Sequence, residues 1–165
     1  MSKKRKTFTK RSQTKPVKSC NAEIVFQEVP GEISLAFSCT GCPIHCPDCH
    51  SKFLWDKELG EEFNEEYLMN WLGKYTPHVS CILFYGGEWE EEWLVGMLKL
   101  VKDLGLKTAL YTGLDDVSQE IKDNLDYLKT GPFVKDCGPL NKRTTNQRMW
   151  DLKKNEDITS KFWRC

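Results

Sequence analysis

Four cysteines lie close together in one short stretch, and this clustering constrains the chain more than any other feature. The chain has eight cysteines in 165 residues, and four of them are Cys39, Cys42, Cys46 and Cys49. Thiolates so near in sequence repel one another unless a cation or a cluster holds them together. The stretch therefore predicts a metal or iron–sulfur centre.

Disulfides and a zinc site are the alternatives to a cluster. Eight cysteines are sparse for a disulfide scaffold of 165 residues, and no secretion signal is expected before them. A zinc site on all four cysteines would use two C-x2-C pairs that are separated only by residues 43–45. Zinc ribbons usually separate their pairs by roughly twelve residues or more. By contrast, the C-x3-C-x2-C triplet of Cys42, Cys46 and Cys49 can hold three irons of a [4Fe–4S] cube. The fourth iron then stays open for an exogenous ligand.

The amino-terminal segment is strongly basic, although the whole chain has a formal net charge of zero. Residues 1–20 contain lysines and arginines but no acid, and few apolar groups. We therefore expect a disordered basic tail over residues 1–20 and one domain over residues 21–165. Two roles stay open for this tail: it aids solubility, or it contacts nucleic acid or an acidic partner. Because no apolar run fits a signal peptide or a membrane span, we expect no membrane contact and a cytoplasmic location.

Short apolar segments alternate with helical patterns along the body of the chain. Strands are predicted over residues 23–29, 33–37, 81–85, 107–111 and, as the last, 126–129. Helices are predicted from an Asn64 cap to Gly73, from about Glu90 to Leu104, and from an Asp115 cap through Leu125. This alternation implies parallel βα units with right-handed crossovers, and hence an α/β fold.

Four segments follow directly on predicted strands. They are the cysteine loop, Gly86-Gly87-Glu88, Tyr111-Thr112-Gly113 and residues 130–133. Ligands of parallel sheets bind at the carboxyl ends of the strands, so we expect these segments to form one shared site. Two glycines let the backbone approach a ligand closely, and Glu88 places an anion beside them.

The string GCPIHCPDCH at residues 41–50 resembles the radical S-adenosylmethionine superfamily. Within that superfamily it resembles the activating enzymes of anaerobic (class III) ribonucleotide reductase, and the similarity covers roughly residues 24–152. The segment TGPFV at residues 130–134 and the segment RTTNQR at residues 143–148 stand where that family has D-G-x-F and S-S-N-Q-R. Trp89 is a departure, since a proline usually follows the acid in the family.

The resemblance implies an open partial (β/α) barrel of mostly parallel strands. It implies that Cys42, Cys46 and Cys49 hold a [4Fe–4S] cluster whose open iron binds S-adenosylmethionine. The residues implied to contact this cofactor are Pro47, Asp48, Cys49, His50, Gly86, Gly87, Glu88, Tyr111 and Thr112. An electron from a donor such as a flavodoxin would release a 5′-deoxyadenosyl radical. That radical would abstract hydrogen from a backbone glycine of the large anaerobic ribonucleotide reductase subunit.

Two other functions stay open. One is within radical chemistry: activation of a different glycyl-radical enzyme, or a small-molecule reaction such as deazapurine synthesis. The other is a zinc-binding, nucleic-acid-associated module that uses the basic tail and the four clustered cysteines. Radical chemistry needs no general base, so neither a Ser/His/Asp triad nor a carboxylate pair is expected.

Overall fold

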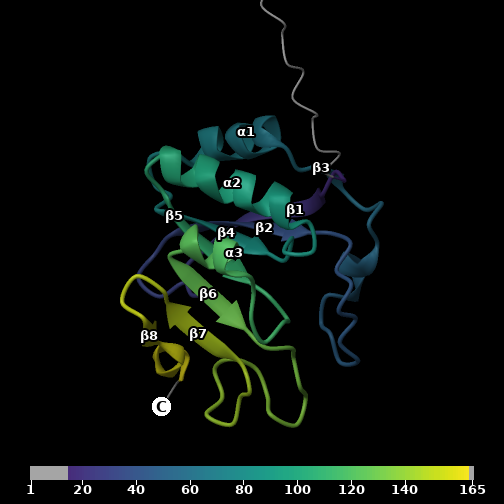
Figure 1. Ribbon diagram of the computed structural model, residues 1–165, viewed down its shortest axis with the longest axis vertical. Helices are drawn as coiled ribbons and strands as arrows, with labels where there is room; N and C mark the ends of the chain where they lie inside the picture. Colours follow the sequence, from purple (N-terminus) through teal and green to yellow (C-terminus); the bar gives the residue numbers. More distant parts are fainter. Residues whose placement is uncertain (1–14, 164–165) are drawn as a thin grey trace, which may run out of the picture.

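The computed structural model describes residues 15–163, which form an eight-stranded mixed sheet and three α-helices (Figure 1). The strands are β1 (Lys18–Val25), β2 (Ser34–Cys39), β3 (Glu61–Glu62), β4 (Cys81–Tyr85), β5 (Lys107–Tyr111), β6 (Tyr127–Thr130), β7 (Arg148–Asp151) and β8 (Glu156–Asp157). The helices are α1 (Glu65–Tyr75), α2 (Glu91–Asp103) and α3 (Gln119–Asp123), with 3-10 turns η1 (Lys52–Trp55) and η2 (Thr159–Phe162).

The centre of the sheet is parallel and its margins are antiparallel. The strand order is β3-β1-β2-β4-β5-β6-β7-β8. Strands β2, β4, β5 and β6 pair in parallel, whereas β1, β3, β7 and β8 are added antiparallel. The α/β class is therefore confirmed. Within the described residues the sheet is open, and the partial barrel stays a prediction.

The two faces of the sheet bury different side chains because successive residues of a strand point to opposite sides. Leu35, Phe37, Ile82, Phe84 and Leu110 pack with the apolar stripes of the helices in the larger core. Ala36, Leu83, Ala109 and Tyr127 lie on the other face, in a smaller core that Val29, Met149 and Ile158 complete. Tyr85 and Tyr111 pack against this second core.

Several predicted elements match the observed bounds closely. β4 and β5 span the predicted residues, and Asn64 caps α1 by accepting a hydrogen bond from the Tyr67 backbone N–H. Gly73 does not end α1, which continues to Tyr75.

Other predictions were wrong. The cap of α3 is Ser118, not Asp115, because the Ser118 hydroxyl accepts from the Ile121 N–H. β1 spans Lys18–Val25 rather than residues 23–29, so the expected tail boundary at residue 20 falls inside a strand. The remainder of the expected tail, residues 1–14, lies outside the described residues. The segment 126–129 is not the last strand, since β7 and β8 follow it.

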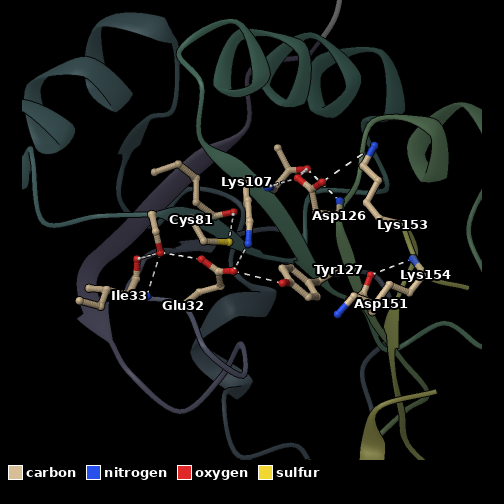
Figure 2. A network of polar contacts seen from close by, with 12 residues as sticks. Glu32, Ile33, Cys81, Lys107, Asp126, Tyr127, Asp151, Lys153 and Lys154 are labelled. Atoms are coloured by element: carbon tan, nitrogen blue, oxygen red, sulfur yellow. Dashed lines mark hydrogen bonds and ion pairs between the residues drawn. The ribbon is translucent and has the colours of Figure 1, made fainter. Parts of the chain in front are cut away.

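One buried carboxylate joins the amino ends of the four parallel strands (Figure 2). Glu32, just before β2, accepts a hydrogen bond from the Ser80 hydroxyl at 2.7 Å and from the Tyr127 hydroxyl at 3.1 Å. It also forms an ion pair with Lys107. Because Ser80, Lys107 and Tyr127 stand at the starts of β4, β5 and β6, this Glu32 network ties the strands together at the end opposite the predicted site.

The helices of the described part of the chain are too short or too polar to cross a membrane. This finding concerns residues 15–163 alone.

Candidate functional site

The segments that follow the four parallel strands meet around one cavity of about 210 Å³. Backbone hydrogen bonds join the segments that follow β4, β5 and β6. The Gly86 N–H donates to Tyr111 O at 2.9 Å, and the Gly131 N–H donates to Leu114 O at 2.7 Å. The residues that line the cavity are Cys39, Cys42, Ile44, Cys46, Cys49, Leu54, Trp55, Tyr85, Gly86, Glu88, Trp89, Tyr111, Thr112, Gly113, Lys129, Gly131, Phe133 and Gln147.

The cysteine loop is held by the η1 turn that follows it. The backbone N–H groups of Gly41 and Cys42 donate to Leu54 O at 2.7 and 3.0 Å. Within the loop, the Ser51 N–H donates to the Cys49 sulfur at 3.3 Å. The His45 ring stacks on Trp55 with 4.4 Å between ring centroids. These contacts fix the loop so that its cysteines face the cavity.

The donor set of the loop fits a [4Fe–4S] cluster. Cys42, Cys46 and Cys49 line the same cavity and are each partly exposed, as thiols that can still reach a ligand must be. A [4Fe–4S] cube takes each thiolate on a different iron, so three cysteines around one cavity satisfy its requirement. Among residues 15–163, no three His, Cys, Asp or Glu side chains form a site for a single metal ion.

Cys39 differs from the other three cysteines of the stretch. It ends β2, its side chain is fully buried, and burial raises the pKa of its thiol well above the ordinary value. Burial also raises the pKa of Cys42, but the backbone N–H groups of Ile44 and His45 partly oppose that shift. The structure thus separates Cys39 from the triplet by burial, although all four cysteines border the cavity.

One carboxylate oxygen of Glu88 is buried in the cavity wall without a hydrogen-bond donor. Its Oε1 atom accepts a hydrogen bond from the Thr112 hydroxyl at 2.7 Å, whereas its Oε2 atom is buried without a hydrogen-bond partner. Burial raises the pKa of this carboxyl, and the Thr112 hydroxyl partly counteracts the effect. A buried acceptor without a donor is costly, so a cationic ligand group such as an amino group fits beside Oε2.

The two glycines before Glu88 leave room for aromatic side chains. Gly86 and Gly87 have φ angles of 83° and 104°, which favour glycine. A Cβ atom on Gly86 would lie 2.6 Å from the Trp89 ring, and one on Gly87 would lie 2.7 Å from Trp93. Trp89, which stands where the family usually has proline, therefore covers Gly86 and forms part of the cavity wall.

Lys129 is a cavity residue that the sequence analysis missed. It has 8% of its surface exposed, and its ammonium donates to Gly131 O at 2.9 Å and to Thr112 O at 3.4 Å. Burial lowers the pKa of Lys129 to about 8, although the negative charges of Cys46 and Glu88 partly counteract this effect. The sequence signal was weak, because Lys129 stands in the short strand Tyr-Leu-Lys-Thr, which also contains a polar threonine.

The segment that contains Asn146 and Gln147 borders the cavity through Gln147, whereas Asn146 is exposed. Gln147 is buried and lines the cavity, and its side-chain amide donates to Gly131 O at 3.4 Å. The Asn146 amide donates to Pro132 O at 2.9 Å. Both side chains therefore hold the segment after β6 in place. Gly131 leaves room for them, since a Cβ atom there would lie 3.2 Å from the Gln147 Cα atom.

The predicted site residues fall into two groups. Cys42, Cys46, Cys49, Gly86, Glu88, Tyr111 and Thr112 line the cavity. Pro47, Asp48, His50 and Gly87 do not belong to its lining, although the His50 ring packs edge-on against Phe133, which does. The roles of all these residues stay predictions.

Comparison with known proteins places most of the described chain in one family. Residues 30–159 match the family described as 4Fe-4S single cluster domain. The chain is 30% identical over 134 residues to a pyruvate formate-lyase-activating enzyme of Clostridium pasteurianum, covering 74% of the chain and 56% of that protein. It is 28% identical over 96 residues to a 7-carboxy-7-deazaguanine synthase of Hyperthermus butylicus, covering 53% of the chain and 40% of that protein. The chain thus spans about half the length of these curated relatives.

Proposed function

Since the chain belongs to the 4Fe-4S single cluster domain family within the radical S-adenosylmethionine superfamily, we propose that it is an activase for a glycyl-radical enzyme. Its cofactors are a [4Fe–4S] cluster and S-adenosylmethionine. The observation that carries the proposal is the single cavity that brings the cysteine triplet next to Gly86, Glu88 and Thr112. We propose the large subunit of anaerobic ribonucleoside-triphosphate reductase as the protein substrate, a flavodoxin-type electron donor and a cytoplasmic location.

Each part of the cavity has a separate task in this proposal. Cys42, Cys46 and Cys49 would hold three irons of the cluster and leave the fourth iron without a protein thiolate, available to S-adenosylmethionine. When bound, the reduced cluster supplies the electron that cleaves a carbon–sulfur bond of this cofactor. Glu88 would accept a hydrogen bond from the cofactor's amino group, and the Thr112 hydroxyl keeps the Glu88 carboxylate oriented by donating to it.

The loops around the cavity orient the cofactor and exclude water. Gly86 lets the backbone approach the cofactor closely, while Trp55, Trp89 and Phe133 supply apolar wall. Tyr111 ends β5 directly before Thr112, and its hydroxyl donates a hydrogen bond to Glu28 O. A reductase docked over the open side of the cavity would complete the enclosure around its own glycine.

The reductase as partner is supported by the carboxyl-terminal segments. Residues 130–134 and 143–148 resemble the reductase activases, and in the fold Asn146 and Gln147 hold residues 131 and 132 beside the cavity. The test combines the anaerobically reconstituted chain, S-adenosylmethionine, a reductant and the reductase of the same organism. We expect an electron paramagnetic resonance signal of a glycyl radical on the reductase, and none with the Cys46→Ala variant.

The choice of partner has its own control. Pyruvate formate-lyase in place of the reductase should give little or no signal under the same conditions. A radical on pyruvate formate-lyase but not on the reductase would leave the activase proposal intact and contradict the choice of partner.

A small-molecule radical reaction is the second candidate, and the similarity to a 7-carboxy-7-deazaguanine synthase supports it. In that case 5′-deoxyadenosine would form in proportion to a small-molecule substrate, without a radical on any partner protein. The zinc module is separated by metal analysis: one colourless zinc per chain supports it, and iron with sulfide supports the activase.

A further inference from the structure

A buried cation lies in the cavity, and the activase proposal gives it no task. Lys129 is on the sheet face opposite the helices, since it alternates with the helix-facing Leu128 along β6. Its ammonium is bonded to the backbone carbonyls of Gly131 and Thr112, and both acceptors are uncharged. Burying an ammonium is costly unless nearby negative charge compensates. Glu88 in the same cavity supplies part of this compensation, and a cluster on the cysteine triplet would add further negative charge there.

The corner of the cavity that holds the Lys129 ammonium also borders Cys46. Thr112 accepts from Lys129, and the next residue, Gly113, lies against the cysteine loop. The Cys46 sulfur is 3.9 Å from the position that a Cβ atom on Gly113 would occupy. Lys129 and Cys46, one of the three proposed cluster ligands, thus line the same cavity and both lie near the Thr112-Gly113 segment.

The charge of a bound cluster explains why this adjacency matters. A [4Fe–4S] cluster on three thiolates is negative overall, and it gains one further negative charge when it takes up an electron. The potential of such clusters depends on net charge, hydrogen bonds to sulfur and solvent exposure. A positive charge in a cavity of low dielectric constant stabilises the more negative, reduced form.

We propose that Lys129 raises the reduction potential of the cluster held by Cys42, Cys46 and Cys49, so that a low-potential one-electron donor can reduce it. This inference rests on the proposed function, because it requires the cluster. The step moves one electron from the donor to the cluster, and it forms or breaks no bond and transfers no proton. In this proposal Lys129 affects the reaction only through the electrostatic effect of its charge on the cluster.

The test compares cluster potentials in four variants. Lys129→Met and Lys129→Gln remove the charge, Lys129→Arg keeps it, and Lys99→Met removes an exposed lysine on α2 as the matched control. Each chain is reconstituted anaerobically and titrated by spectroelectrochemistry at pH 7 without S-adenosylmethionine, so that contacts to that cofactor play no part. We expect at least a tenfold smaller equilibrium constant for reduction in Lys129→Met and Lys129→Gln, a shift of about 59 mV to more negative potential. The potential of Lys129→Arg should stay close to that of the unmodified chain, because the positive charge is kept. The potential of Lys99→Met should equal that of the unmodified chain.

The outcomes separate this inference from the proposed function. Equal potentials in the unmodified chain, Lys129→Met and Lys129→Gln would overturn the inference and leave the activase proposal standing. If Lys129→Met fails to load a cluster, Lys129→Gln decides, because its amide can still donate to Gly131 O. An unmodified chain that assembles no cluster at all would overturn both.

Discussion

At the scale of single residues, burial distinguishes Cys39 from the other three clustered cysteines. Cys39 is fully buried at the end of β2, whereas Cys42, Cys46 and Cys49 are partly exposed around the cavity. Changing any one of the three to alanine should remove a cluster ligand and abolish cleavage of S-adenosylmethionine. Cys39→Ala should retain full iron and sulfide after anaerobic reconstitution. Loss of iron from Cys39→Ala would show that the ligand assignment is wrong.

Glu88 is the residue most directly tied to binding of S-adenosylmethionine. Glu88→Gln keeps the shape of the side chain but removes the charge that would face the cofactor's amino group. Because hydrogen bonds to charged groups contribute about 1.5–3 kcal/mol, the dissociation constant should rise roughly tenfold to 100-fold. Equilibrium binding to the reconstituted chain measures this change, with iron content as the control. An unchanged dissociation constant would exclude Glu88 from the cofactor site.

Gly86 tests whether the backbone conformation itself is needed. Gly86→Ala would place a Cβ atom 2.6 Å from the Trp89 ring at a φ angle of 83°, so the loop before Glu88 must move. We expect weakened cofactor binding and a lower unfolding midpoint. Gly96→Ala on α2 is the matched control, since a Cβ atom there meets no atom within 4 Å. This helical substitution should stabilise the protein by about 0.5–1 kcal/mol, and equal behaviour of the two variants would argue against a conformational role for Gly86.

At the scale of elements, local sequence signals decided which predictions succeeded. β4 is a continuous apolar run between Ser80 and Gly86, and β5 lies between Gly105, which follows a helix, and Thr112-Gly113, so the sequence placed both correctly. The start of α3 was missed because Asp115, Asp116 and Ser118 are all plausible caps, and the Ser118 hydrogen bond to Ile121 decides between them only in the fold. β7 and β8 were missed because β7 has only two apolar residues between charged ones and β8 has two residues, and both pair with strands placed beside them by the fold.

The Glu32 network gives a prediction about stability of the sheet. Glu32→Gln keeps the hydrogen-bonding shape but removes the ion pair with Lys107 at the amino ends of the parallel strands. Because Glu32 is buried, we expect a loss of about 1–3 kcal/mol in the free energy of unfolding at pH 7, measured with urea. Glu58→Gln, which weakens an exposed pair with Lys18, should change it by less than about 1 kcal/mol.

The same network predicts how stability varies with pH. Burial alone would raise the pKa of Glu32, but hydrogen bonds from Lys107, Ser80 and Tyr127 outweigh it and leave this pKa below the ordinary 4.5. A lowered carboxyl pKa stabilises the fold above the unfolded-state pKa, and this contribution is lost as pH falls through the folded-state pKa. The difference between the unmodified chain and Glu32→Gln should therefore be full at pH 7 and shrink below about pH 4.5. A constant difference down to pH 3 would contradict this assignment.

At the scale of the whole molecule, the parallel centre of the sheet brings distant segments to one cavity. The sequence predicted this convergence because each segment follows a strand, and strand ends of a parallel sheet share an edge. It could not predict that Lys129 is buried or that Gln147 reaches Gly131 O, because both depend on contacts between segments far apart in the chain. It also could not predict that Trp89 would cover Gly86, since that contact depends on the shape of the loop.

The amount of 5′-deoxyadenosine formed per cluster tests the central claim most directly. The anaerobically reconstituted chain would be given S-adenosylmethionine and a one-electron reductant, and its iron and sulfide would be counted. We predict about four irons and four sulfides per chain, a brown colour lost in air, and release of 5′-deoxyadenosine. One colourless zinc per chain, or a cluster fully ligated by four cysteines that releases no 5′-deoxyadenosine, would contradict the account.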